Sequence, residues 1–201
     1  MMKLLAATTN EGKIREIEKL LTGSSLEIEF YSLADFNITA DCPERGETFL
    51  ENSIEKSLFY SRMKGDIYTI ADDSGLAVEA LGGRPGVHSA RYAGEPKDDG
   101  KNIQKLLLEL NNTANRKAKF TAVVTLAKNG RVIKSFTGEV EGIILKEKRG
   151  TGGFGYDPIF YYPPLQKTFA QLTAEEKNQI SHRAIAFKKL KEFLIVNDIG
   201  R

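Results

Sequence analysis

Two local patterns in this chain of 201 residues predict a mixed β-sheet. Near the start, the short apolar run Lys3 to Thr8 predicts a buried strand. A polar loop then leads into a helix, where Ile14, Ile17 and Leu20 recur at helical spacing. A strand, loop and helix in this order are typical of parallel crossover connections. Further on, Asn129-Gly130 lies between two β-rich segments and predicts a hairpin, which joins antiparallel strands. We therefore expect an α/β fold with a long mixed β-sheet flanked by helices.

The remaining elements follow from hydrophobic spacing and from turn-forming residues. Asp72-Asp73-Ser74-Gly75 is expected to end a strand, because these residue types favour turns. The return strand after the hairpin either runs unbroken or divides after Gly138. We expect further helices over Thr48–Met63 and Asp98–Leu110, and strands over Tyr68–Ala71, Lys119–Leu126, Arg131–Leu145 and Ile159–Tyr162. Thr173, with Glu176 three residues on, resembles a capping box that leads to Ser181-His182-Arg183 and a closing amphipathic helix through Leu194. The inner side of the second helix is expected to carry Phe49, Leu50, Ile54, Ser57, Leu58 and Ser61.

Length and composition indicate one globular domain over residues 1–201, or two closely joined lobes. Cys42 is the only cysteine, which excludes a disulfide framework and fits a reducing compartment. The first apolar stretch is too short for a signal peptide, and no apolar run approaches the roughly 20 residues that span a bilayer. We therefore expect a soluble, cytoplasmic protein. A net charge of +2, with basic and acidic residues interleaved, argues against nucleic acid as a partner.

The segment Thr8-Thr9-Asn10-Glu11-Gly12-Lys13 is a candidate anion site. A strand that ends in small polar residues and enters a helix presents unpaired backbone N–H groups and a positive dipole end. Lys13, in the first helical turn, adds a positive charge. The segment is not a P-loop, because Ile14 follows the lysine where that motif has a hydroxyl residue. An ordinary N-capped helix with a solvated lysine explains the same residues.

The adjacent acids Asp72 and Asp73 are the second candidate site. One carboxylate is suited to hold a metal, while the other braces the loop or accepts a proton from water. An ordinary turn is the alternative explanation for these residues. Against the turn, two acids at a buried strand end are costly unless a cation is present.

Two further segments are suited to a nucleobase. Gly150 to Pro158 is rich in glycine, so its backbone can approach a ligand closely. Within it, Phe154 and Tyr156 offer aromatic faces, and Asp157 is an acceptor. Lys177, His182 and Arg183 gather donors near a helix start. A mobile glycine turn and a structural histidine are the alternatives.

The acids Glu44, Glu47 and Glu51 precede or open the second helix, as expected on dipole grounds alone. Asn52 and Lys56 lie four residues apart on one face of that helix. By itself this segment predicts no site. Taken together, the candidate segments combine acids for a divalent cation, cations for phosphates and a flexible aromatic loop. This combination favours a Mg²⁺–nucleotide site.

The same segments, in the same order, resemble the inosine triphosphate pyrophosphatase family, also called the Ham1-like or non-canonical purine NTP pyrophosphatases. The matching stretches are TTNEGKIREI, ETFLENSIEKS, IADDSGLAVEALGGRPGVHSARYAG, GTGGFGYDPIF and KTFAQLTAEEKNQISHRAIA. The resemblance implies two lobes around the sheet with the substrate cleft between them, a Mg²⁺ cofactor and usually a homodimer. It also implies hydrolysis of ITP, dITP and XTP to the monophosphate and pyrophosphate.

The resemblance further implies roles for single residues. Asp73 would be the catalytic acid/base and a metal ligand, with Glu44 as the second metal ligand. Pro43 departs from the family pattern, because many relatives have another acid at that position. The substrate-binding residues would be Thr8, Thr9, Asn10, Glu11, Gly12, Lys13, Ser74, Phe154, Gly155, Tyr156, Asp157, Lys177, His182 and Arg183.

The expected mechanism is attack by water on the α-phosphorus, with departure of pyrophosphate. Two alternatives stay open at the level of sequence. A phosphohydrolase that cuts at the γ-phosphate would release orthophosphate and a diphosphate instead. A nucleotide sensor would bind without turnover, although a sensor has no need of a water-activating acid.

Overall fold

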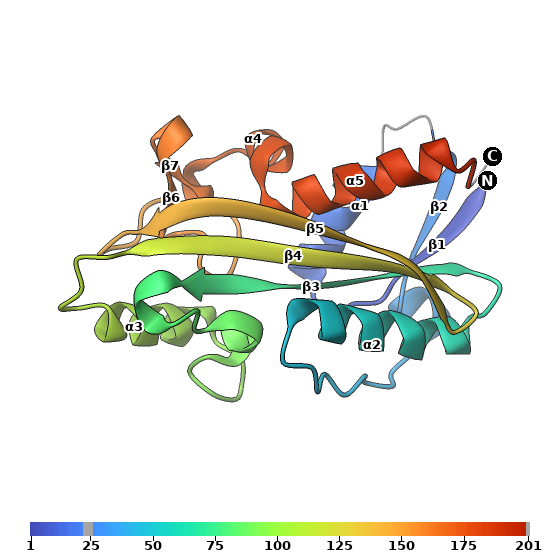
Figure 1. Cartoon of the computed structure of the whole chain (residues 1–201), viewed down its shortest axis with the longest axis horizontal. Helices are drawn as coiled ribbons and strands as arrows, with labels where there is room; N and C mark the ends of the chain where they lie inside the picture. Colours follow the sequence, from blue (N-terminus) through green and yellow to red (C-terminus); the bar gives the residue numbers. More distant parts are fainter. Residues whose placement is uncertain (22–25, 200–201) are drawn as a thin grey trace. The chain divides into compact units, whose positions relative to one another are not determined.

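The computed structural model describes residues 1–21 and 26–199, and within them the strands form one mixed sheet (Figure 1). Its order is β2-β1-β3-β4-β5-β6-β7. Strand β1 pairs in parallel with β2 and β3, whereas β6 pairs antiparallel with β5 and β7. The strands are β1 (Met2–Ala6), β2 (Ile28–Ser32), β3 (Tyr68–Val78), β4 (Lys117–Lys128), β5 (Arg131–Ile144), β6 (Phe160–Tyr162) and β7 (Lys167–Thr168). The predicted mixed α/β sheet is confirmed.

The helices begin where the sequence places capping residues. Thr48 and Glu51 form a capping box at the start of α2, and Thr173 and Glu176 form the predicted one at the start of α4. The Asp98 side chain accepts from the Lys101 amide, 2.9 Å away, at the start of α3. Each such cap contributes about 1 kcal/mol. The α-helices are α1 (Glu11–Leu21), α2 (Phe49–Met63), α3 (Asp99–Glu109), α4 (Ala174–Ile180) and α5 (His182–Val196). Short 3₁₀ segments span Ala34–Phe36, Glu79–Leu81, Gly86–Arg91, Pro163–Leu165 and Phe169–Gln171.

The chain divides into two compact units. The first unit comprises Met1–Asp73, Ala122–Gly138 and Arg183–Arg201, and the second comprises Ser74–Thr121 and Glu139–His182. Strands β3, β4 and β5 each contribute residues to both units. The expectation of a single domain over residues 1–201 stays a prediction.

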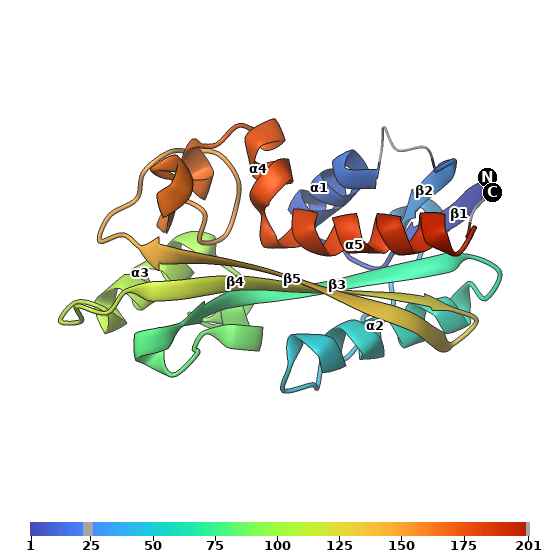
Figure 2. The same cartoon turned by 45° about the horizontal axis from the view of Figure 1, so that its top comes forward.

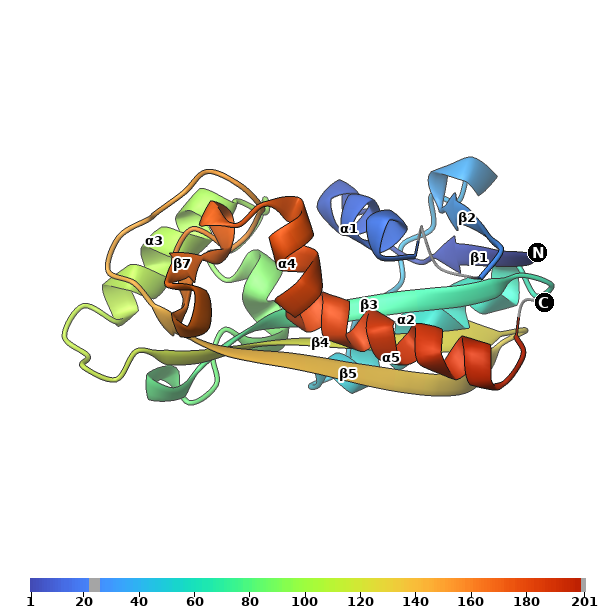
Figure 3. The same ribbon diagram turned by 90° about the horizontal axis from the view of Figure 1, so that it is seen from above.

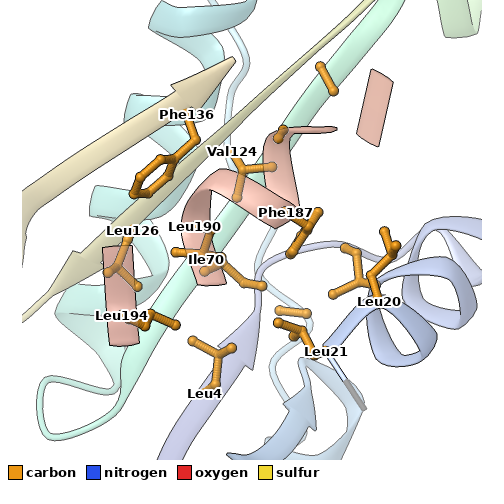
Figure 4. Packing of buried hydrophobic residues seen from close by; sticks show 14 of the residues in the cluster. Leu4, Leu20, Leu21, Ile70, Val124, Leu126, Phe136, Phe187, Leu190 and Leu194 are labelled. Carbon is orange, nitrogen blue, oxygen red and sulfur yellow. The ribbon is translucent and has the colours of Figure 1, made fainter. Parts of the chain in front are cut away.

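In the first unit, both faces of the sheet are covered by apolar side chains. Consecutive side chains of a strand point to opposite faces, so a run of apolar residues contributes to both. On β1, Leu4 and Ala6 join the core that packs against α1 and α5, shown in close-up in Figure 4. Leu5 and Ala7 join a second core, which includes Tyr60 of α2. Figures 2 and 3 show the same arrangement, with α1 and α5 on one side of the strands and α2 on the other.

The inner face of α2 confirms Ser57 and Ser61 but otherwise differs from the prediction. Its buried residues are mainly polar, whereas Leu50, expected inside, is 45% exposed. The Ser53 hydroxyl lies within hydrogen-bond distance of the Thr125 hydroxyl on β4 and donates to the Ala71 carbonyl on β3. The helix therefore approaches the sheet through small polar side chains, which a search for apolar periodicity overlooks. The buried residues of α2 are Asn52, Ser53, Lys56, Ser57, Tyr60 and Ser61.

Strand β3 also differs from the prediction, because it continues through Asp72-Asp73-Ser74-Gly75 to Val78. Gly75 serves close packing here rather than a turn: a Cβ at this position would overlap the Ser89 hydroxyl and the Gly86 carbonyl. Strand β5 runs unbroken past Gly138, while the short strands β2 and β7 had no prediction. The Asn129-Gly130 hairpin turn is confirmed, with φ angles of 50° and 68°.

No helix in the described ranges is long and apolar enough to cross a membrane.

Candidate active site

Asp72 and Asp73 are neighbours on β3 and belong to the first unit. Consecutive side chains of a strand point to opposite faces of the sheet. Ile70, two residues before Asp72, lies in the core under α1 and α5, whereas Ala71, two residues before Asp73, lies in the core beside α2. The two carboxylates consequently meet different partners.

Asp72 contacts two cations from the helices on its face. Its Oδ2 lies 2.8 Å from Lys13 Nζ of α1 and 3.2 Å from Arg183 Nε of α5. Arg183, only 2% exposed, also donates to Glu16 of α1. A buried charge of this kind is tolerated only with close partners. Asp72 therefore joins two helix starts, and its role in the first unit is structural as well as electrostatic.

Asp73 contacts α2 on the other face. Asn52 Nδ2 donates to Asp73 Oδ2 over 3.2 Å, and Lys56 Nζ lies 4.0 Å from Asp73 Oδ1. Asp73 is 7% exposed. Burial raises the pKa of its carboxyl above the ordinary value, and the charges of Lys13 and Lys56 oppose this rise. A carboxylate in this setting is a stronger base than one in water.

Lys56 links Asp73 to Glu44. Its Nζ lies 2.7 Å from Glu44 Oε1, in addition to its contact with Asp73. Burial lowers the pKa of Lys56, but the two carboxylates outweigh it and raise the pKa overall. Neither Lys56 nor Asn52 is among the predicted site residues. The only sign of them in the sequence is their four-residue spacing, which places both side chains on one face of the predicted helix.

Among the described residues, no group of three or more His, Cys, Asp and Glu side chains is arranged to hold a metal ion. Glu44 and Asp73, the two predicted ligands, both approach the Lys56 ammonium. Two carboxylates of this kind fit a magnesium ion that arrives with a nucleotide, because Mg²⁺ is usually bound by one or two carboxylates plus substrate phosphates.

The predicted phosphate segment begins α1 with an ordinary cap. Asn10 Oδ1 accepts from the Lys13 amide at 3.1 Å, and the Asn10 amide donates to the Thr8 hydroxyl at 3.2 Å. Glu11 pairs with Arg15 on the exposed surface at 3.3 Å. Lys13 is the member of the segment that contacts Asp72, and burial lowers the pKa of its ammonium. Thr9, in the loop between β1 and α1, and Gly12, in the first turn of α1, complete the segment.

The second unit holds the predicted base-binding residues. Lys177 Nζ lies 2.6 Å from Asp157 Oδ2 and 5.0 Å from the centre of the Phe154 ring. Asp157 Oδ2 also accepts from the Phe154 amide at 3.0 Å. Lys177 and Asp157 form a buried ion pair beside an aromatic ring, and this places four predicted residues together: Phe154, Gly155, Asp157 and Lys177. Ser74, the first residue of this unit, follows Asp73 on β3.

Tyr156 and His182 are also buried in the second unit. Tyr156 is 4% exposed, and its hydroxyl donates to the Ser89 carbonyl at 2.9 Å. Burial raises the pKa of this phenol. The His182 ring stacks on Phe120, with 4.7 Å between the ring centres. Both rings are already packed against the protein, which leaves Phe154 as the partly exposed aromatic ring of this group.

A model of the Ham1 family matches residues 4–193, which include every predicted site residue. The chain belongs to the Ham1 family. Two relatives are both dITP/XTP pyrophosphatases. One, from Desulforamulus reducens, is 47% identical over 196 residues, with 96% of each chain covered. The other, from Geobacillus kaustophilus, is 49% identical over 195 residues, with 96% of this chain and 94% of the relative covered.

Solved Ham1 structures have the same fold. A HAM1 protein from Coxiella burnetii matches with a TM-score of 0.88 and 40% identity, covering 98% of this chain and 100% of its own. The Ham1 protein from Staphylococcus aureus matches with a TM-score of 0.87 and 43% identity, covering 97% and 99%. The open mixed sheet described above is thus the Ham1 fold. The roles of the individual residues stay predictions.

Proposed function

We propose that this chain hydrolyses the non-canonical purine nucleoside triphosphates dITP, XTP and ITP to the nucleoside monophosphate and pyrophosphate. The observation that carries the proposal is a buried acid, Asp73, between Asn52 and Lys56 on a Ham1 fold. The relatives from Desulforamulus reducens and Geobacillus kaustophilus bear the name dITP/XTP pyrophosphatase, and they match this chain over nearly its full length. The activity removes damaged purine nucleotides from the nucleotide pool.

Asp73 is the proposed general base. It orients the attacking water and accepts its proton, so that water attacks the α-phosphorus while pyrophosphate departs. Burial raises the pKa of this carboxyl, which makes it a better proton acceptor. Asn52 donates to one of its oxygens and limits its rotation, leaving the orientation of the carboxylate defined.

The cations of the first unit offset phosphate charge. Lys13 and Arg183 are held by Asp72, and Lys56 is held by Glu44. Positive groups fixed in place before the reaction stabilise charge that develops on the phosphates without needing to reorganise. Thr8 to Lys13 contribute the loop after β1 and the first turn of α1, where the helix dipole favours an anion.

Mg²⁺ is the proposed metal, with Glu44 and Asp73 as its protein ligands. When bound, it supplies Lewis-acid polarisation of the phosphate oxygens. Its carboxylate partners suit a hard cation that prefers oxygen ligands. Lys56, which contacts both carboxylates, balances their charge in the protein alone.

The Phe154–Asp157 segment, Lys177 and His182 are proposed to bind the base and the adjoining groups, with Ser74 next to Asp73. Inosine and xanthosine carry a 6-keto group where adenosine has an amine, so a donor at that position discriminates between them. One mismatched buried hydrogen bond costs about 1–3 kcal/mol, or roughly 5- to 150-fold. Guanine shares the keto group, and its rejection therefore needs further contacts around position 2.

A panel of dITP, XTP, ITP, ATP, GTP and dTTP, assayed with and without Mg²⁺, tests the proposal. We expect metal-dependent release of monophosphate and pyrophosphate from the first three, with the common nucleotides nearly untouched. Orthophosphate with a diphosphate would instead indicate cleavage at the γ-phosphate. Binding without turnover would indicate a sensor.

A homodimer in the cytoplasm is also part of the proposal, because the family resemblance implies the dimer and the substrates belong to the nucleotide pool. Light scattering on the purified chain at several concentrations tests the dimer. A constant monomer mass would contradict it.

A further inference from the structure

Asp99 is the first residue of α3 and was not a candidate site residue at the level of sequence. Its Oδ2 accepts from the Gly155 amide at 2.7 Å, although the two residues are 56 positions apart in the chain. Both belong to the second unit. The carboxylate therefore reaches directly into the segment proposed to bind the base.

We propose that Asp99 is a positioning residue for the nucleobase: through the Gly155 amide it holds the Phe154–Asp157 segment in its binding conformation. This inference rests on the proposed function, since it takes that segment as the base site. A hydrogen bond from an amide to a charged carboxylate is among the stronger ones in proteins. Its loss releases the backbone at the residue that follows Phe154.

The local backbone needs such support. Gly155 has a φ of +61°, and residues 150–158 form turns and bends without helix or strand. Within the segment, Asp157 accepts from the Phe154 amide at 3.0 Å. That hydrogen bond shapes the turn but does not fix it to the rest of the unit. Fixation requires a partner outside the segment, and Asp99 is one.

Helix α3, which carries Asp99, is itself held in place by hydrogen bonds. Asn102, one turn beyond Asp99 and buried, accepts from the Ala93 amide at 2.7 Å and donates to the Ala90 carbonyl at 3.0 Å. The preceding carbonyl, that of Ser89, accepts from the Tyr156 hydroxyl. The first turn of α3 thus supports the base segment twice, directly through Asp99 and indirectly through residues 89–93.

Steady-state kinetics with dITP and Mg²⁺ separate positioning from catalysis. Asp99→Ala should raise KM about ten-fold, equivalent to about 1.4 kcal/mol, while kcat stays within two-fold. The inhibition constant of the product dIMP should rise by a similar factor. Asp99→Asn keeps an acceptor oxygen and should restore most of the affinity.

Asp98→Ala is the matched control. It removes the neighbouring acid, with the same charge change, and it removes the cap that accepts from the Lys101 amide. It should weaken α3 and lower the melting temperature while leaving KM unchanged. An unchanged KM in Asp99→Ala, an equal rise in Asp98→Ala, or no rescue by Asp99→Asn would each overturn the inference.

Hydrogen exchange across residues 150–158 tests the same contact without turnover. We expect a slowly exchanging Gly155 amide in the wild type and in Asp99→Asn, and a faster one in Asp99→Ala. A fast amide in the wild type would overturn the inference even if Asp99→Ala failed to fold. If the wild type does not hydrolyse dITP, the proposed function is wrong. The exchange measurement still tests the contact between Asp99 and Gly155, because it does not depend on turnover.

Discussion

Asp72 and Asp73 are consecutive in the chain, but their carboxylates serve opposite faces of β3. Asp72 lies 2.8 Å from Lys13 Nζ, whereas Asp73 accepts from Asn52 on the other side. The alternation of a strand thus gives two identical side chains different partners. One acid joins the helices α1 and α5, and the other faces α2.

Substitution of the two acids should consequently have different effects. Asp73→Asn should lower kcat by roughly two to four orders of magnitude, because it removes the proposed base, while the melting temperature changes little. Asp72→Asn should destabilise the protein by about 3 kcal/mol, because partly buried Lys13 and buried Arg183 both lose this carboxylate, although Arg183 keeps its ion pair with Glu16. Urea unfolding and dITP turnover measure both effects. A fully active Asp73→Asn would refute its role as the base.

Lys56→Met should reduce kcat/KM by at least ten-fold. The substitution removes the cation between Glu44 and Asp73 but keeps an unbranched apolar stem in the buried position. Lys3→Met, which alters an exposed lysine on β1, is the control and should leave kcat/KM unchanged. A rate within two-fold of the wild type in Lys56→Met would show that Lys56 has no part in turnover.

Glu44→Gln should raise the Mg²⁺ concentration needed for half-maximal rate by roughly ten-fold, with the maximal rate largely recovered at high Mg²⁺. Glu47→Gln removes an exposed acid three residues away and should leave the Mg²⁺ requirement unchanged. Chelation with EDTA should stop turnover in all three proteins. If Glu44→Gln and the wild type have the same Mg²⁺ requirement, Glu44 is not a metal ligand.

The two units should unfold in one cooperative step, because β3, β4 and β5 contribute residues to both and cannot be broken in one unit alone. Cys42, the only thiol, is buried in the first unit and reports its opening through reaction with a thiol reagent. Hydrogen exchange in residues 160–172 reports on the second unit. The two urea midpoints should coincide, and two separate midpoints would establish independent domains.

Local patterns in the sequence predicted the elements whose signals are themselves local. The capping box at Thr173, the helical spacing after Asn10 and the Asn129-Gly130 turn depend on residues a few positions apart. The prediction that Asp72 to Gly75 end a strand was wrong. Asp, Ser and Gly favour turns, but tertiary packing keeps these residues in β3. No local pattern reveals that Gly75 faces the Ser89 hydroxyl.

The candidate site was predicted in outline, from the acids on β3, Lys13, and the aromatic segment with its lysine. The residues that orient these groups were not predicted. Asn52 is 21 positions from Asp73, and Asp99 is 56 positions from Gly155. Such partners meet only once the sheet has formed, and each looks like an ordinary helix residue in the sequence.

Helix α2 carries an amide, an ammonium and hydroxyls on the side where helices of its length usually bury leucine or valine. The groups proposed to act in chemistry occupy positions that would otherwise contribute apolar burial. Apolar residues at Asn52 and Lys56 would stabilise the helix only if buried Asp73 were replaced as well, because a carboxylate left there without partners is costly. Selection for greater stability and selection for faster turnover therefore favour different residues at the same few positions of α2.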